Sequence, residues 1–304
     1  MMSHKRGVDG ILILNKPKGY TSHDCVAKIR KLSQTKKVGH TGTLDPEVTG
    51  VLPVCLGKAT RVIEFLTLDE KEYVAEITLG KSTTTEDQSG DAVEDEPLID
   101  PPKERELLNV LKQFIGPVEQ VPPMYSAVKV NGKRLYEYAF EGQEVDRKPR
   151  TVLIHHLELL SYDPEGPYPK FLIRVLCSKG TYIRTLGVDL GRALGHPAHV
   201  SALTRTRSGR FTLEESVTLA DIERWGRQDW QNNLHRMDAG LDRFPRMTLN
   251  DDFIKRIKFG QTIHIPFNVK ENQIYRIYDR RDQFVALYES AKPHLIKPKK
   301  VFQV

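Results

Sequence analysis

The hydrophobic pattern predicts strands along the first 180 residues of the chain. Residues 10–17 form a short apolar run that ends at a proline, as a buried strand does. In 71–80 the apolar side chains alternate, so every second residue from Tyr73 to Leu79 shares one face. By this pattern alone Tyr73 is a core residue. The same alternation predicts two later strands, at 151–160 and 170–177.

Helices are predicted where apolar residues recur every three to four positions. Thr21 and Ser22 cap the first helix, and Asp24 lies in its first turn. A second begins after Asp100 and stops at Gly116, and a third follows the Lys179-Gly180 pair. Their apolar faces are, in order, Val26, Ile29 and Leu32; then Leu107, Leu108, Leu111, Phe114 and Ile115; then Ile183, Leu186, Leu190 and Leu194.

The segments between these elements differ in character. Residues 81–97 are predicted to be an acidic surface loop, and 212–240 a polar helical connection. Asn131-Gly132, between AVKV and KRLY, predicts a hairpin within the base-rich stretch 124–150. After Pro245, a helix at 251–259 and three alternating segments predict a small β-rich unit.

Composition narrows the class of protein. The 304 residues are 39% hydrophobic and 28% charged, which is typical of a globular chain of about two domains. No apolar run approaches the roughly 18 residues that a membrane helix needs, and the N-terminal apolar patch is too short for a signal sequence. The three separated cysteines, Cys25, Cys55 and Cys177, suggest neither zinc nor disulfides. We therefore expect a reducing, cytoplasmic location and no membrane partner.

Charge is distributed unevenly. The net charge is +6, yet residues 81–106 hold nine acidic residues against three basic ones. The rest of the chain is therefore more basic than the total suggests. Such a surface suits a polyanionic partner, and charge alone leaves an ordinary solvated basic surface equally open.

One stretch, residues 38–61, stands out chemically. It presents a single carboxylate, Asp45, among glycines and threonines, and Pro46 restricts its backbone. The apolar run VLPVCLG follows and would anchor the loop to the core. A rigid loop that presents one acid suits a nucleophile or a general base, although local chemistry by itself favours an ordinary Asp-Pro turn.

A family resemblance bears on this choice. GHTGTLDP, followed by G, L and GKAT, is similar to the catalytic motif of the TruB family, the tRNA pseudouridine-55 synthases. Val48 stands where many members have a small residue. Other segments resemble the family in its own order: NKPKGYTSHD, KEYVAEITLG, VPPMYSAVKVNGKRLYEYA, SKGTYIRTLGVDLG and SALTRTRSGRF. The resemblance covers residues 10 to about 240 well and the last sixty weakly.

The resemblance implies a fold, a reaction and a partner. The fold would be α+β, a mixed and largely antiparallel sheet with flanking helices, plus a small β-rich, PUA-like C-terminal domain. We expect a catalytic domain at 1–245, with an RNA-gripping insertion at about 124–150, and an RNA-binding domain at 246–304. The reaction breaks the C1′–N1 bond of a uridine and rejoins the base through C5. It needs no cofactor or metal. The partner would be the T-arm stem-loop of tRNA, bound by a monomer.

The resemblance also assigns the site. Asp45 would act on the uridine, Arg184 would keep that carboxylate ionised and aimed, and Tyr73 would stack beside the uracil. Tyr182 would also stack, Leu203 would line the pocket, and His40 would help to extrude the base. The remaining residues assigned to substrate binding are Lys16, Arg205 and Arg207, the two arginines as part of a phosphate patch.

Two alternatives stay open. A non-catalytic RNA-binding or tRNA-folding protein would use the same basic surface. A guide-RNA-dependent pseudouridine synthase subunit would share the chemistry, although the insertion at 124–150 favours an enzyme that acts alone.

Overall fold

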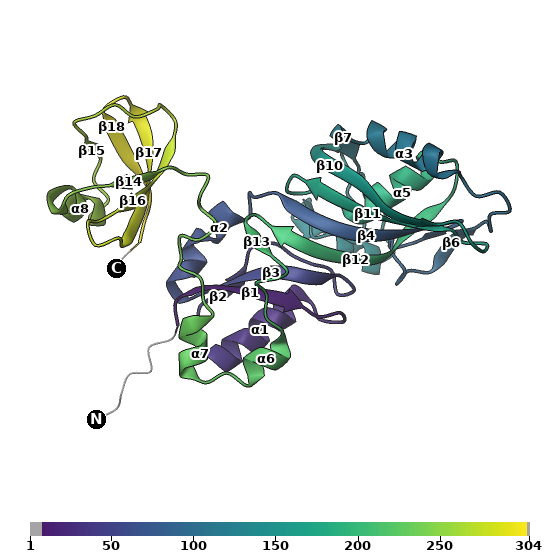
Figure 1. Ribbon diagram of the computed structural model, residues 1–304, viewed down its shortest axis with the longest axis horizontal. Coiled ribbons are helices and arrows are strands. Elements are labelled where there is room, and N and C mark those ends of the chain that lie inside the picture. The colour runs from purple at the N-terminus through teal and green to yellow at the C-terminus, as the bar shows by residue number, and fades with distance from the viewer. Residues whose placement is uncertain (1–7, 303–304) are drawn as a thin grey trace.

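The computed structural model describes residues 8–302, and within them strands from both halves of the chain build one large sheet (Figure 1). Its strands are β1 (Gly10–Lys16), β2 (Val38–His40), β3 (Thr49–Leu56), β4 (Lys71–Leu79), β7 (Gly116–Gln120), β10 (Arg150–Asp163), β11 (Lys170–Cys177), β12 (Ala198–Ser208) and β13 (Phe211–Thr212). They run in the order β1-β3-β12-β4-β11-β10-β7, with β2 on β3 and β13 on β12. Strands β3 and β12 pair in parallel and the other pairs are antiparallel. The predicted mixed, largely antiparallel sheet is therefore confirmed.

Helices accompany this sheet, and most of them cover its apolar surfaces. They are α1 (Ser22–Ser33), a 3-10 turn η1 (Gly57–Val62), α2 (Ile63–Leu66), α3 (Glu104–Gln113), α4 (Leu135–Phe140), α5 (Ile183–Ala193), α6 (Leu219–Glu223) and α7 (Arg227–Asn232). Helices α3 and α5 share an apolar core with strands β4, β10 and β11, whereas α1, α6 and α7 pack on β1 and β3. Along residues 8–302, we find no helix with both the length and the apolar character to cross a bilayer.

Local signals account for several of these elements. At the start of α1 the Thr21 hydroxyl accepts the Asp24 N–H, and the Asp24 carboxylate accepts the Thr21 N–H, as the predicted cap requires. The predicted hairpin is present as β8 (Lys129–Val130) and β9 (Lys133–Arg134), with positive φ at both Asn131 and Gly132.

Two predictions made from local pattern were wrong. Val110 of α3 is buried, whereas Leu108 of α3 and Ile115, just after the helix, are 40% and 48% exposed. The reason is that α3 packs on β10 and α5 through the side that carries Leu107, Val110 and Leu111. Residues 81–97 are not a simple surface loop: β5 (Lys81–Thr83) pairs with β6 (Ala92–Asp95), and the turn between them folds back onto the large sheet. There the Val200 N–H donates to the Glu86 carbonyl at 3.1 Å.

The C-terminal residues form a separate small sheet, seen in yellow at one end of Figure 1. It contains β14 (Arg246–Thr248), β15 (Ile263–His264), β16 (Ile274–Tyr278), β17 (Phe284–Lys292) and β18 (Leu295–Val301), with helix α8 (Asp251–Lys258) beside it. The expected β-rich C-terminal domain is confirmed, although β14 and β18 were not predicted.

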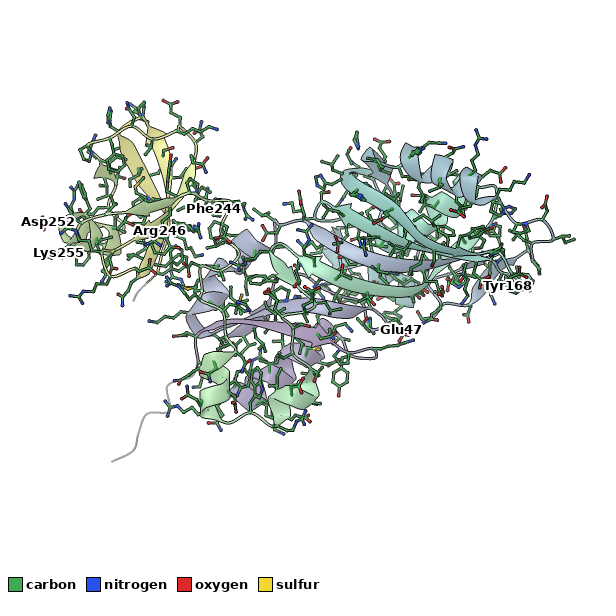
Figure 2. All side chains as sticks on the ribbon, in the orientation of Figure 1. Glu47, Tyr168, Phe244, Arg246, Asp252 and Lys255 are labelled. Atoms are coloured by element: carbon green, nitrogen blue, oxygen red, sulfur yellow. The ribbon has the colours of Figure 1, made fainter. Side chains whose placement is uncertain are left out.

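One apolar cluster joins the two sheets. Figure 2 labels Phe244, in the segment between them, and Arg246, the first residue of β14. The cluster unites buried residues from both sides, namely Phe65, Phe211, Leu241 and Phe244 with Tyr278, Phe284, Leu287 and Phe302. The C-terminal domain is thus packed onto the rest of the chain rather than tethered to it.

Candidate active site

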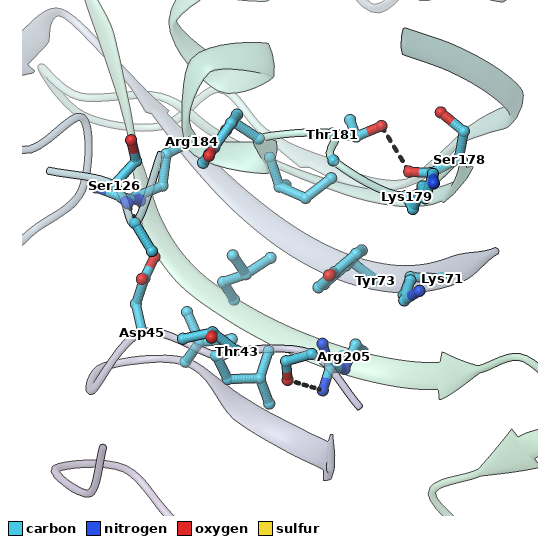
Figure 3. Close-up of a pocket in the computed structure, with 18 of the residues that line it drawn as sticks. Thr43, Asp45, Lys71, Tyr73, Ser126, Ser178, Lys179, Thr181, Arg184 and Arg205 are labelled. Carbon is cyan, nitrogen blue, oxygen red and sulfur yellow. Dashed lines mark hydrogen bonds and ion pairs between the residues drawn. The ribbon is translucent and has the colours of Figure 1, made fainter. Parts of the chain in front are cut away.

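A cavity of about 250 Å³ lies where the loop after β2, the start of β4 and the turn before α5 meet (Figure 3). It brings together side chains that are remote in sequence, including Thr43, Asp45, Lys71, Tyr73, Ser126, Lys179, Tyr182, Arg184, Leu203 and Arg205. Six residues predicted for the site are among them, namely Asp45, Tyr73, Tyr182, Arg184, Leu203 and Arg205. The topology explains this meeting, because β4 lies between β12 and β11 and the helix α5 connects those two strands.

Asp45 and Arg184 form an ion pair at this cavity. The Asp45 Oδ2 atom lies 2.9 Å from Arg184 Nη2. The carboxylate side chain is 42% exposed, whereas the arginine side chain is only 6% exposed. A buried guanidinium therefore holds an accessible carboxylate, which is the arrangement that a reacting acid needs.

Both Nη atoms of Arg184 make further contacts. Its Nη1 donates to the Thr85 carbonyl at 2.7 Å, and its Nη2 donates to the Tyr125 carbonyl at 2.8 Å. The carboxylate of Asp87 lies 3.7 Å from Nη1. Sequence reasoning missed Thr85 and Asp87, because residues 81–97 had been assigned to the surface.

Several anchors fix the loop that carries Asp45. The Lys16 ammonium donates to the carbonyls of Pro17, Tyr20 and Pro46, the last at 3.0 Å. The Ser22 hydroxyl accepts the Leu44 N–H at 2.9 Å. The assignment of Lys16 to substrate binding is therefore corrected. Its side chain is 0% exposed, and its three donors hold the backbone on either side of the loop.

Aromatic and apolar side chains form another wall of the cavity. Tyr73 on β4 is the cross-strand partner of Arg205 on β12. Burial raises the pKa of Tyr73, and burial likewise raises the pKa of Tyr182. Both rings therefore present neutral faces at neutral pH. Leu203 lies on β12, beside Tyr73, and completes an apolar surface against which a flat base can pack.

Three models of known protein families match the chain. Residues 30–183 match the model of the TruB family pseudouridylate synthase N-terminal domain. Residues 184–243 match the tRNA pseudouridylate synthase B C-terminal domain, and 245–302 match the Pseudouridine synthase II TruB C-terminal model. The chain belongs to the TruB family. Its enzyme class is accordingly that of the pseudouridine synthases, which are isomerases.

Relatives of this TruB-family chain match it almost end to end. It is 48% identical over 301 residues to the tRNA pseudouridine synthase B of Bacillus licheniformis, covering 96% of this chain and 97% of the relative. It is 47% identical over 296 residues to that of Shouchella clausii, with 96% and 98% covered.

Solved structures give the same fold. A chain in the crystal structure of a Cbf5-Nop10-Gar1 complex aligns with a TM-score of 0.75 and 32% identity, covering 97% of this chain and 85% of that one. A chain in the structure of an H/ACA RNP bound to a substrate RNA containing 2′-deoxyuridine aligns with a TM-score of 0.74 and 29% identity, covering 97% and 85%.

Three further residues predicted for substrate binding, His40, Arg205 and Arg207, do not lie as expected. His40 on β2 is half-buried outside the lining of the cavity, its Nδ1 accepts the Gly42 N–H at 3.3 Å, and burial lowers its pKa. Arg205 lines the cavity, yet it is 1% exposed and donates to the Val51 and Gly42 carbonyls. Arg207 lies in a separate hollow near Arg243, so the two arginines do not form one patch.

Lys71 is a lining residue of the TruB-family cavity that sequence reasoning did not single out. It lies two residues before Tyr73 on β4, and the period of two that places Tyr73 on one face of the strand places Lys71 there as well. The signal was therefore present in the sequence.

Proposed function

We propose that this chain converts the uridine at position 55, in the T-loop of tRNA, to pseudouridine. The observation that carries the proposal is the Asp45–Arg184 ion pair at the mouth of a base-sized cavity. The curated relatives that match nearly the whole chain bear the name tRNA pseudouridine synthase B, which supports the choice of substrate.

The proposed roles follow from position. Asp45 is the carboxylate that reacts with the uridine, and Arg184 holds it negative and oriented. Tyr73 and Tyr182 receive the flipped base on their faces, and Leu203 closes the apolar side. Stacking of about 1–3 kcal/mol per base offsets part of the few kcal/mol that extrusion costs. His40, next to the Asp45 loop, helps the base to leave its stack.

The test uses a T-arm hairpin tritiated at C5 of the target uridine. Asp45→Asn should lower tritium release by a factor on the order of a thousand or more, because a neutral amide cannot act as nucleophile or base. Hairpin affinity should change by less than about threefold, since Asp45 is one small side chain of a large interface. Glu47→Gln, which removes a neighbouring carboxylate that pairs with Lys18, is the matched control and should retain turnover. Persistent tritium release by Asp45→Asn would refute the catalytic role.

A guide-RNA-dependent subunit is the second candidate, favoured by the structural similarity to the H/ACA RNP chain. Purified protein and a bare T-arm hairpin separate the two. The stand-alone enzyme forms pseudouridine with these components alone, whereas a guided subunit needs an added RNA. A protein that binds the hairpin tightly and never modifies it would instead be an RNA-folding protein.

We also propose a role for the C-terminal domain, a cellular compartment and an oligomeric state. The C-terminal sheet serves as a PUA-like RNA-binding domain, and the cations in the last turn of α8, including Lys255 and Lys258, suit phosphate contacts. The free cysteines, all three buried, suit a reducing cytoplasm. The protein acts as a monomer, which analytical ultracentrifugation would check.

A further inference from the structure

Two lysines are buried around the cavity, and their ammonium groups are used differently. Lys16 gives all three donors to backbone carbonyls. Lys71, which is 7% exposed, donates to the Thr67 carbonyl at 2.9 Å and to the Asp69 carbonyl. Within residues 8–302 its third N–H has no recorded acceptor, and the side chain lines the cavity. Lys71 therefore keeps one N–H group available for a ligand at the edge of the cavity.

The charges around Lys71 are mostly positive. Arg205 on β12 and Lys179 in the turn before α5 line the same cavity. The two acids of the neighbouring turn have other partners, since Asp69 pairs with Arg243 and Glu70 lies 3.3 Å from His155. Cys177 on β11 is a buried thiol whose pKa burial raises to about 11, so it carries no charge at neutral pH. Asp45 lies at the opposite side of the view in Figure 3, with Tyr73 between it and Lys71.

We propose that Lys71, assisted by Arg205 and Lys179, binds a backbone phosphate of the RNA adjacent to the uridine that enters the cavity. The inference rests on the proposed RNA substrate and adds a specific contact to it. A phosphodiester carries the negative charge that three neighbouring cations require, whereas the carbonyls of a uracil do not. With Asp45 at one end of the cavity and a fixed phosphate at the other, the sugar and base between them are held in position.

The pKa of Lys71 predicts how RNA binding through this residue should depend on pH. Burial, together with the nearby cations Arg205 and Lys179, lowers the pKa of Lys71 to about 8. The free protein therefore loses this positive charge as the pH rises through 8. A bound phosphate favours the charged form, so RNA affinity should be highest below pH 8 and should fall above it.

The decisive experiment is a double-mutant cycle on a T-arm hairpin, measured in the Asp45→Asn background so that the RNA is not converted. Single methylphosphonates, which remove one phosphate charge each, are scanned through the positions that flank the target uridine. At one position, Lys71→Met and the methylphosphonate should each weaken binding by about tenfold, with no further loss when combined. The slope of log affinity against log salt should also become shallower by about 0.7 in Lys71→Met.

Controls separate a phosphate contact from a structural role. Lys112→Met removes a cation from the exposed side of α3, away from the cavity, and should leave affinity and methylphosphonate sensitivity unchanged. Lys71→Arg keeps the charge at all accessible pH values, so its affinity should stay flat from pH 7 to 9.

Three results would overturn the proposal: losses that add at every scanned phosphate, unchanged affinity in Lys71→Met, or an equal pH-dependent loss for native and methylphosphonate hairpins. The last comparison uses unsubstituted Lys71, so it decides the matter even if Lys71→Met does not fold. If tritium release by the unsubstituted protein shows that the hairpin is converted, such results overturn the Lys71 contact alone and leave the proposed reaction intact.

Discussion

At the scale of single residues, buried cations hold the site together. Lys16, Arg184 and Arg205 are each almost fully buried, and all three donate to backbone carbonyls around the cavity. A buried charge is costly unless it is satisfied, so each of these contacts restricts the backbone that provides it. Arg184 also forms ion pairs with two carboxylates, those of Asp45 and Asp87. Of these two acids, only Asp45 lines the cavity.

Asp87→Asn should therefore reduce kcat about tenfold while KM for the hairpin changes little, because it removes a charge that orients Arg184 and not a substrate contact. Steady-state tritium release measures both parameters. Asp91→Asn, an acid exposed in the same turn, is the control and should be silent. Equal losses in the two variants, or an effect on KM alone, would show that Asp87 does not act through Arg184.

At the scale of elements, the parallel pairing of β3 with β12 sets the position of the catalytic loop. Thr204 and Arg205 pair with Thr49 and Gly50, directly after that loop. Gly50 has a φ of +103°, and a Cβ there would lie 2.2 Å from the Arg205 carbonyl oxygen. Only glycine allows the two strands to approach so closely.

Gly50→Ala should lower the free energy of unfolding by more than about 2 kcal/mol, since backbone strain and a backbone clash act together. Gly132→Ala in the β8–β9 turn is the matched control. Its φ is also positive, at +85°, but a Cβ would meet open space, so the cost should be only about 1–2 kcal/mol. Urea unfolding of both variants measures the difference. Equal losses of unfolding free energy in the two variants would mean that the backbone at Arg205 moves aside for the added Cβ at little cost.

At the scale of the whole molecule, the shared apolar cluster makes the two sheets one stability unit. Phe302 of the C-terminal part is 1% exposed, packs on Phe284, and has the Arg61 guanidinium over its ring. Removing residues 246–304 would strip the cover from Phe65 and Phe211. Such a truncation would therefore report lost stability as well as any lost RNA contact.

Phe302→Ala should destabilise the catalytic part as well as its own sheet, by about 3–5 kcal/mol. The two tryptophans, Trp225 and Trp230, lie in the catalytic part, so their fluorescence reports its unfolding, while circular dichroism reports the whole chain. The two urea transitions should coincide and shift together. Phe259→Ala, at a side chain 83% exposed, should shift neither. A fluorescence transition unaffected by Phe302→Ala would indicate independent domains.

The sequence by itself determined the elements whose signals are local. The α1 cap, the alternation of β4 and the Asn131-Gly132 turn each depend on interactions within a few residues, so they can be read from spacing. The resemblance to the TruB motifs supplied the residues of the candidate site, and the period of two could also have indicated Lys71. None of these local patterns specifies which distant segments meet.

Only the tertiary structure decided those meetings. Thr85 and Arg184 are 99 residues apart, and the contact exists because the β5–β6 turn folds back over α5. The same long-range packing made Lys16 a buried anchor instead of a substrate-binding residue and placed Arg205 and Arg207 in different hollows. The physical reason is that burial and hydrogen-bond partners depend on what lies opposite a side chain in space, and composition and periodicity carry no record of that neighbour.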